Sequence, residues 1–187
     1  MLRLGLAALL SVALLTGCMS PKGDTVDEKR QAAQQMRSET LARLYEIHPY
    51  AKGQIEAAAG YAVFSNVGVN LLLLSTASGW GIVHERASGQ DTYMKMYSAG
   101  IGPGLGVKDF RGIFVFTDPE ALKSFVEDGW DASAQADAVA KAEDKGDGWA
   151  GSVDVAPGIK LYQLTETGLA LQATIQGTKF WKDDELS

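Results

Sequence analysis

Cysteine and histidine are scarce in this chain. Its 187 residues include one cysteine, Cys18, and two histidines, His48 and His84. A single cysteine excludes an internal disulfide. His48 has no partner at the spacing of a zinc motif, and His84 alternates with Val83 in a predicted strand, at an expected exposed position. With no Gly-x-Ser-x-Gly elbow either, the sequence predicts a protein that is not an enzyme and holds no metal or cofactor.

The uncharged apolar segment near the N-terminus is too short to cross a membrane as a helix. Residues 4–15 form an apolar run of 12 residues after Arg3, whereas a spanning helix needs roughly 20. The run therefore predicts a secretory signal peptide. It leads into Leu15-Thr16-Gly17-Cys18. These four residues resemble the lipobox of bacterial lipoproteins, where the cysteine receives diacylglycerol and becomes the new N-terminus; a chance cysteine after an ordinary signal peptide is the alternative.

This assignment predicts the location of the mature chain. Removal of residues 1–17 takes Arg3 away and leaves 16 basic against 23 acidic residues, a net charge of −7. Such a charge argues against nucleic acid as a partner. Several acyl chains on Cys18 would anchor the protein stably in membrane lipid. Met19 is not the aspartate associated with inner-membrane retention, so we expect the bacterial cell envelope, at the outer membrane facing the periplasm.

The rest of the chain predicts one domain. We expect a signal peptide over 1–17, a lipidated N-terminus and tether over 18–27, and a single domain over 28–187. Apolar residues at three- and four-residue spacing predict an amphipathic helix over 26–47, and a short helical piece is expected around 55–59. A capping residue, proline and acidic side chain at 118–120 predict a mid-chain helix that Gly129 ends.

Alternating segments predict strands between these helices. They cover residues 61–65, 80–85, 91–99, 110–116, 159–164 and 169–175, with a hairpin turn between 85 and 91. The apolar run 69–74 suits a buried strand or a buried helical turn. Residues 130–142 are rich in alanine yet alternate, and we interpret them as a strand. The fold class is therefore α+β, a largely antiparallel β-sheet system with an N-terminal amphipathic helix and one mid-chain helix.

Two further patterns invite a ligand. Residues 100–106 alternate glycine with other residues but lack the spacing and the following helix of a nucleotide loop. Alternate glycines allow another backbone or a ligand to come close, which fits a lipid-binding groove or simple strand packing. The acidic residues Asp144, Asp147 and Asp154 and the tail 182–185 lack calcium-loop spacing, so we expect solvated surface there.

Three blocks, read in order, resemble the SYLF domain family, in its bacterial lipoprotein branch. They are Ala59-Gly60-Tyr61-Ala62-Val63-Phe64-Ser65-Asn66-Val67-Gly68, the stretch from Gly102-Pro103-Gly104-Leu105-Gly106 to Gly129-Trp130-Asp131-Ala132, and Tyr162 with Gly168-Leu169-Ala170-Leu171-Gln172-Ala173, Gly177 and Lys179-Phe180-Trp181. Residues 70–75 depart from the glycine-rich stretch of the family.

The resemblance implies contact with a lipid or another amphiphile. Glycines and apolar walls would admit an acyl chain, so the expected lipid-contacting residues are Gly102, Gly104, Leu105, Lys179, Phe180 and Trp181. The acidic loop 143–154 is not expected to contact lipid, because carboxylates beside hydrocarbon would have to be desolvated. The alternative is a scaffold that binds an envelope protein partner and uses lipid only through the Cys18 anchor.

The lipobox assignment makes a direct prediction. Cys18→Ala removes the thiol that would be acylated, so incorporation of radiolabelled palmitate should be lost and the unprocessed precursor should accumulate. Metabolic labelling and electrophoretic mobility measure both effects. Normal labelling and processing of the variant would refute the assignment.

Overall fold

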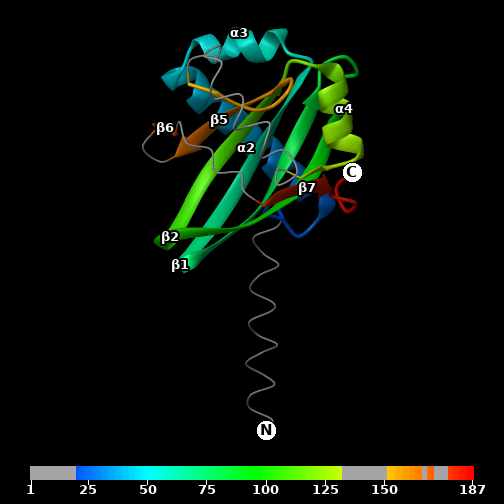
Figure 1. Ribbon diagram of the computed structural model, residues 1–187. Helices are drawn as coiled ribbons and strands as arrows, with labels where there is room; N and C mark the ends of the chain where they lie inside the picture. Colours follow the sequence, from blue (N-terminus) through cyan, green and yellow to red (C-terminus); the bar gives the residue numbers. More distant parts are fainter. Residues whose placement is uncertain (1–19, 132–150, 166–167, 171–176) are drawn as a thin grey trace.

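The computed structural model describes residues 20–131, 151–165, 168–170 and 177–187, and for 68–75, 100–109, 165 and 168–170 it describes the backbone alone (Figure 1). Cys18 and the predicted signal peptide lie outside the described residues. The described elements are α2 (Val26–Ile47), α3 (Tyr50–Ala57), β1 (Gly60–Glu85), β2 (Asp91–Phe116), α4 (Pro119–Glu127), β3 (Trp130–Asp131), β4 (Val153–Ala156), β5 (Ile159–Thr165), β6 (Gly168–Ala170) and β7 (Thr178–Lys182). The predicted α+β class is confirmed.

Helix α2 has the predicted bounds and a complete capping box. Thr25 Oγ1 accepts from the backbone N–H of Glu28 at 3.2 Å. The Glu28 carboxylate accepts in return from the backbone N–H groups of Asp24 at 2.8 Å and Thr25 at 3.0 Å. These backbone hydrogen bonds stabilise the charged form and lower the pKa of Glu28. The ordered structure thus begins before residue 28, within the stretch predicted as the end of the tether.

Strands β1 and β2 form one antiparallel ribbon, 26 residues long in each strand. Pairing runs from Gly60↔Phe116 to His84↔Asp91, so the predicted hairpin turn between 85 and 91 is confirmed. The separate strands predicted over 61–65, 69–74 and 80–85 are joined in β1, and those over 91–99 and 110–116 in β2. The pairing continues through the alternating glycines, with one register shift between Leu72 and Leu74.

The ribbon reverses direction near its middle, so the two halves of β1 touch (Figure 1). A Cβ atom built on Gly81 would lie 2.6 Å from the carbonyl oxygen of Val63, and one on Gly79 would lie 2.7 Å from Asn66 Cβ. Both distances are shorter than real Cβ contacts. The reversal therefore depends on glycine at the places where the halves meet.

Each half of the ribbon is extended by other strands of one sheet. The second half of β2 pairs with β5 from Arg111↔Leu164 to Phe116↔Ile159. On its other side β5 pairs with β4 and β6. The first half of β2 pairs with β7 from Met94↔Lys182 to Ser98↔Thr178. Strand β3 then adds to β7. Of the strand predicted over 130–142, only β3 belongs to the described residues.

The sheet curls around one core and carries another on its outside. The inner cluster packs the inward faces of both halves against α4 and includes Ala62, Phe64, Val83, Met94, Met96, Phe114, Phe116, Leu122, Phe125, Leu161 and Phe180. The outer cluster packs α2 and α3 against the other face and includes Met36, Leu44, Ile55, Val63, Ile113, Val115 and Tyr162. Both clusters lie within residues 20–187, so this part of the chain contains its own cores.

Helix α4 forms as the sequence predicts. The Asp118 side chain accepts from the backbone N–H of Glu120 at 3.0 Å, and Pro119 opens the first turn. Gly129 follows the helix with a φ of 72°, a conformation that favours glycine. Its buried residues, Leu122 and Phe125, face the inner cluster. None of the described helices is long and apolar enough to cross a membrane.

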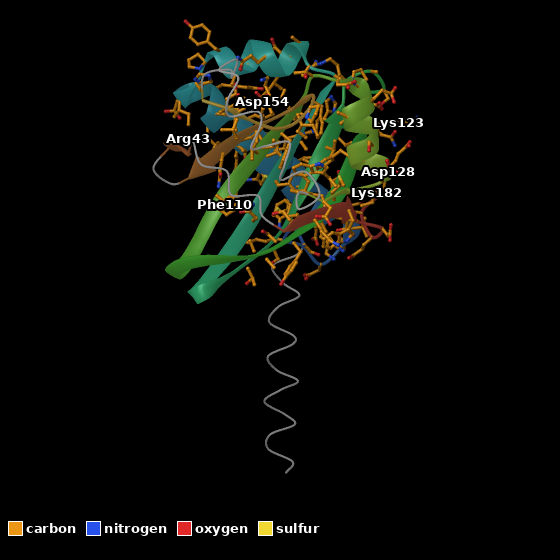
Figure 2. All side chains as sticks on the ribbon, viewed as in Figure 1. Arg43, Phe110, Lys123, Asp128, Asp154 and Lys182 are labelled. Atoms are coloured by element: carbon orange, nitrogen blue, oxygen red, sulfur yellow. The ribbon has the colours of Figure 1, made fainter. Side chains whose placement is uncertain are left out.

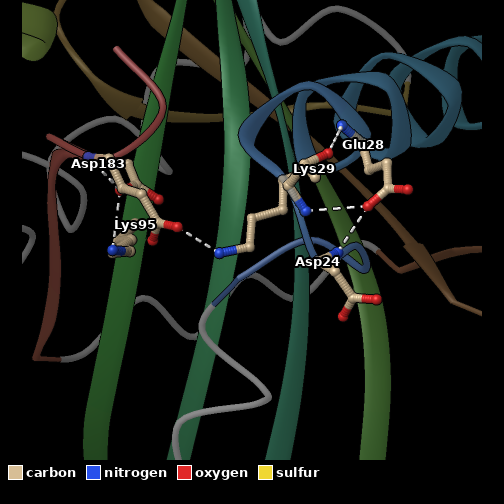
Figure 3. A network of polar contacts seen from close by, with 7 residues as sticks. Asp24, Glu28, Lys29, Lys95 and Asp183 are labelled. Atoms are coloured by element: carbon tan, nitrogen blue, oxygen red, sulfur yellow. Dashed lines mark hydrogen bonds and ion pairs between the residues drawn. The ribbon is translucent and has the colours of Figure 1, made fainter.

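The C-terminal tail packs against the start of α2, which the sequence did not predict (Figure 3). Asp183 is 1% exposed and pairs with Lys95 at 2.9 Å, and Glu185 pairs with Lys29. Arg30 Nε donates to the Leu186 carbonyl at 2.9 Å. The expectation of a solvated acidic tail was therefore wrong for Asp183, because lysines of β2 and α2 offer these carboxylates partners.

Contact between the two halves of β1 predicts different costs for two glycine substitutions. Gly81→Ala should lower the free energy of unfolding by about 1–3 kcal/mol, since the new methyl group overlaps the backbone of Val63. Gly53→Ala, in α3 with no atom within 4 Å of the added Cβ, should raise it by about 0.4–1 kcal/mol. Urea unfolding of residues 20–187 measures both. Equal effects would contradict the close contact.

Candidate functional site

A glycine interrupts the inward face of β2 and leaves a cavity. Phe110, Gly112, Phe114 and Phe116 alternate along this face. A Cβ on Gly112 would lie 3.5 Å from Leu161 Cδ1 and 3.6 Å from Phe114 Cε2, ordinary contact distances. The space that a larger side chain would fill is part of a cavity of about 50 Å³ that opens to solvent at its mouth. A cavity of this size admits a group of a few non-hydrogen atoms, such as the end of an apolar chain.

Aromatic rings and a thioether form the apolar part of the cavity wall. Phe64 meets Phe180 edge-on with ring centroids 4.9 Å apart, and Phe114 meets Phe180 at 5.3 Å. Because Phe64 and Phe114 come from one half of the ribbon and Phe180 pairs with Met96 of the other half, both halves contribute. Leu161 of β5, opposite Phe114, completes this layer. The cavity therefore exists only because the ribbon reverses.

A polar layer follows the apolar one on four strands. Four apolar members have a polar inward residue two positions away, in the pairs Phe64 and Asn66, Met96 and Ser98, Leu161 and Gln163, and Phe180 and Thr178. Ser98 and Thr178 are directly paired in the sheet, and the Thr178 hydroxyl donates to Ser98 Oγ at 2.9 Å. The wall thus changes from apolar to polar toward the bend of the ribbon. Phe110, at this level, lies where β2 leads to the bend (Figure 2).

Asn66 is buried in the polar layer with one unsatisfied atom. Its side chain is 4% exposed. The amide Nδ2 donates to Met96 Sδ at 3.5 Å, whereas Oδ1 has no hydrogen-bond partner among the described residues. A thioether sulfur accepts and does not donate, so the amide nitrogen faces Met96 and the oxygen is left free. Buried polar atoms are normally paired, which makes this oxygen a candidate ligand contact.

No charged side chain lines the cavity among the described residues. Lys160 and Lys179, next in sequence to cavity residues, pair with Asp154 at 2.6 Å and with Asp131 at 3.3 Å. No three histidine, cysteine, aspartate or glutamate residues of the described part are grouped to hold a metal ion. The arrangement can hold an apolar group at one level and a hydrogen-bonding group at the next.

The predicted lipid-contacting residues fall in three places. Phe180 lines the cavity. Lys179 and Trp181, its neighbours in β7, alternate to the outward face, where Trp181 is 38% exposed. Gly104 and Leu105, paired with Leu72 and Leu71, and Gly102 beside the register shift belong to the bend of β2. The structure describes only the backbone there, so their contact with lipid stays a prediction.

Sequence analysis did not single out Gly112, Asn66, Ser98, Gln163 or Thr178. Each occupies an inward position of an alternating strand, where glycine or a polar residue is unexpected. That anomaly was visible in the sequence. It became informative only once the structure brought the four strands together, because a single polar residue in a strand is also consistent with a sheet edge.

The two histidines lie outside the cavity. His84 Nδ1 is 2.8 Å from Asp91 Oδ1, which also accepts from Arg37 at 2.8 Å. The His84 side chain is 26% exposed, so the expected exposed position was wrong. The reason is its place opposite Asp91 in the hairpin, which α2 covers through Arg37. His48 is near the end of α2, with its ring centroid 5.7 Å from that of Tyr162.

Comparison with known proteins finds a relative but no matching family model. The chain is 35% identical over 177 residues to Beta cell expansion factor A of Aeromonas veronii. The match covers 92% of this chain and 64% of that protein, so the chain spans less than two thirds of its relative's length. The relative's name gives an effect and no ligand or reaction. The chain is therefore similar to Beta cell expansion factor A over nearly all of its own length.

Proposed function

We propose that this chain is an envelope lipoprotein whose non-catalytic SYLF-like domain binds a lipid or another amphiphile. The carrying observation is the cavity between the two halves of the ribbon, with an apolar layer of Phe64, Phe114 and Phe180 and a polar layer that includes Asn66 and Thr178. An amphiphile offers the same two surfaces in the same order. The lipid-binding character implied by the family resemblance agrees with this wall.

Burial of hydrocarbon supplies the driving force for such binding. Each methylene group moved from water into the apolar layer contributes about 0.8 kcal/mol. The rings of Phe64, Phe114 and Phe180 are packed against one another and against Phe125, so the wall exists before the ligand enters. A preformed wall reduces the ordering cost of binding. The polar layer then orients the ligand, because the apolar end of the ligand cannot form a hydrogen bond with Asn66.

The proposed anchor keeps this cavity near membrane lipid. The acyl chains on Cys18 would lie in the outer membrane, and the domain would lie on its periplasmic side. Helix α2 begins at Val26 after its cap at Thr25, so six residues separate the anchor from the cap. The seven Cα–Cα steps from Cys18 to Thr25 span at most roughly 25 Å. The domain would remain within one protein diameter of the bilayer, where an amphiphile can be exchanged.

Cavity filling tests the proposal. Gly112→Val adds a side chain at a cavity-lining position, where its Cβ meets neighbours at ordinary distances, and valine suits a strand. Residues 20–187 purified from cells should carry lipid in native mass spectrometry, and Gly112→Val should carry at least about tenfold less, since even part of the lost burial exceeds 1.4 kcal/mol. Both proteins should give the same circular dichroism.

The control is Ala99→Val, which adds two methyl groups and creates the same valine side chain at an exposed position of the same strand. It should retain the wild-type amount of lipid. Retention of lipid by folded Gly112→Val would place the ligand elsewhere. Absence of lipid from every protein, together with a specific envelope protein captured by crosslinking, would favour the scaffold alternative.

A further inference from the structure

We infer that the cavity selects an uncharged amphiphile with a hydroxyl group beside its apolar chain, and that Asn66 Oδ1 accepts the hydrogen bond of this hydroxyl. The inference rests on the proposed function and names the ligand class for the same cavity. It makes Asn66 a specificity-determining residue. Three features of the polar layer support the inference. The unpaired atom of Asn66 is a hydrogen-bond acceptor, the hydroxyl of Thr178 is already bonded to Ser98, and the described lining carries no charge.

The free group of Asn66 is an acceptor. Its Nδ2 is used by Met96 Sδ, and the reversed amide would place oxygen against a sulfur that cannot donate. Oδ1 is buried without a partner among the residues that the structure describes. A ligand atom that meets it must therefore donate. A hydroxyl does so, whereas an ether or an ester of the same shape would leave the oxygen unsatisfied.

The neighbouring hydroxyl groups do not compete for this role. Thr178 is 3% exposed, and its hydroxyl donates to Ser98 Oγ at 2.9 Å. This pair crosses the sheet between β7 and β2, directly beyond the Met96↔Phe180 pair. Its hydrogen bond is already made within the protein. Asn66, on β1, is thus the member of the polar layer with a documented free acceptor.

The absence of charge restricts the ligand further. The described wall contains phenylalanine, methionine, leucine, glycine and uncharged polar residues. A carboxylate, phosphate or ammonium group placed there would lose its hydration without a counter-ion, which is strongly unfavourable. The lysines next in sequence to cavity residues, Lys95, Lys160 and Lys179, are paired with Asp183, Asp154 and Asp131. The donor is therefore a neutral hydroxyl.

A matched ligand series tests this inference on residues 20–187. The probes are 1-octanol, octyl methyl ether and octanoate at pH 7. Each is titrated into protein that holds a fluorescent naphthylamine, and the fluorescence lost as the naphthylamine is displaced gives the affinity of the probe. For the wild type, 1-octanol should bind at least about tenfold more tightly than the ether, since the ether leaves a buried acceptor unpaired. Octanoate should bind at least about tenfold more weakly than 1-octanol.

The variant Asn66→Leu removes the acceptor and keeps a similar volume. It should bind 1-octanol and the ether within about twofold of each other, and Ala99→Val should keep the wild-type preference. Equal wild-type affinities for alcohol and ether, or tighter binding of octanoate, would overturn the inference and leave the proposed function standing. Failure of all three probes to bind would instead overturn the proposed function. If Asn66→Leu does not fold, the wild-type series decides alone.

Discussion

Contact between the two halves of β1 is the constraint on which the rest of the structure depends. Gly79 and Gly81 let the halves meet with backbone against backbone. This contact turns one long ribbon into a curled sheet whose inward faces oppose each other. The inner core, which packs against α4, and the cavity both lie between those faces. Without the reversal, Phe64 and Met96, the partner of Phe180 in the sheet, would lie in distant parts of an open ribbon.

The same alternation that builds the core also builds the cavity. Inward residues near α4 are apolar and buried, as is Phe116, which packs against Phe125 of α4. Farther along the strands Gly112 leaves space, and inward residues at this end include the polar Asn66 and Thr178 beside the apolar Phe110. A change in side-chain size and a change in polarity therefore coincide at one level of the sheet. That coincidence of space with an unsatisfied Asn66 Oδ1 is the reason that we propose a binding site here.

Features governed by local chemistry were predicted well from the sequence. The bounds of α2, the Asp118–Pro119 start of α4 and the turn after Glu85 depend on residues within a few positions of one another. The joining of the predicted strands was not predictable, since continuous pairing through the alternating glycines of β2 depends on a partner strand. Asp183 shows the same limit, because its burial depends on Lys95 in another strand.

The same contrast between local and long-range features applies to the candidate site. Phe180 was predicted to meet lipid and lines the cavity, but the reason was its aromatic neighbourhood at the strand end. Trp181, predicted for the same reason, faces outward because successive residues of a strand point to opposite faces. Asn66 and Gly112 could be recognised only after the strands were placed beside one another. The predicted lipidation of Cys18 is independent of the fold and remains a prediction.

The central claim is that the space between the two halves of the ribbon holds the ligand. Intermolecular nuclear Overhauser effects between 1-octanol and isotope-labelled residues 20–187 test it most directly. The account predicts contacts from the methylene protons to the rings of Phe64, Phe114 and Phe180, which line the cavity. Contacts confined to the exposed rings of Tyr97 and Trp181, with none to the three phenylalanines, would contradict it.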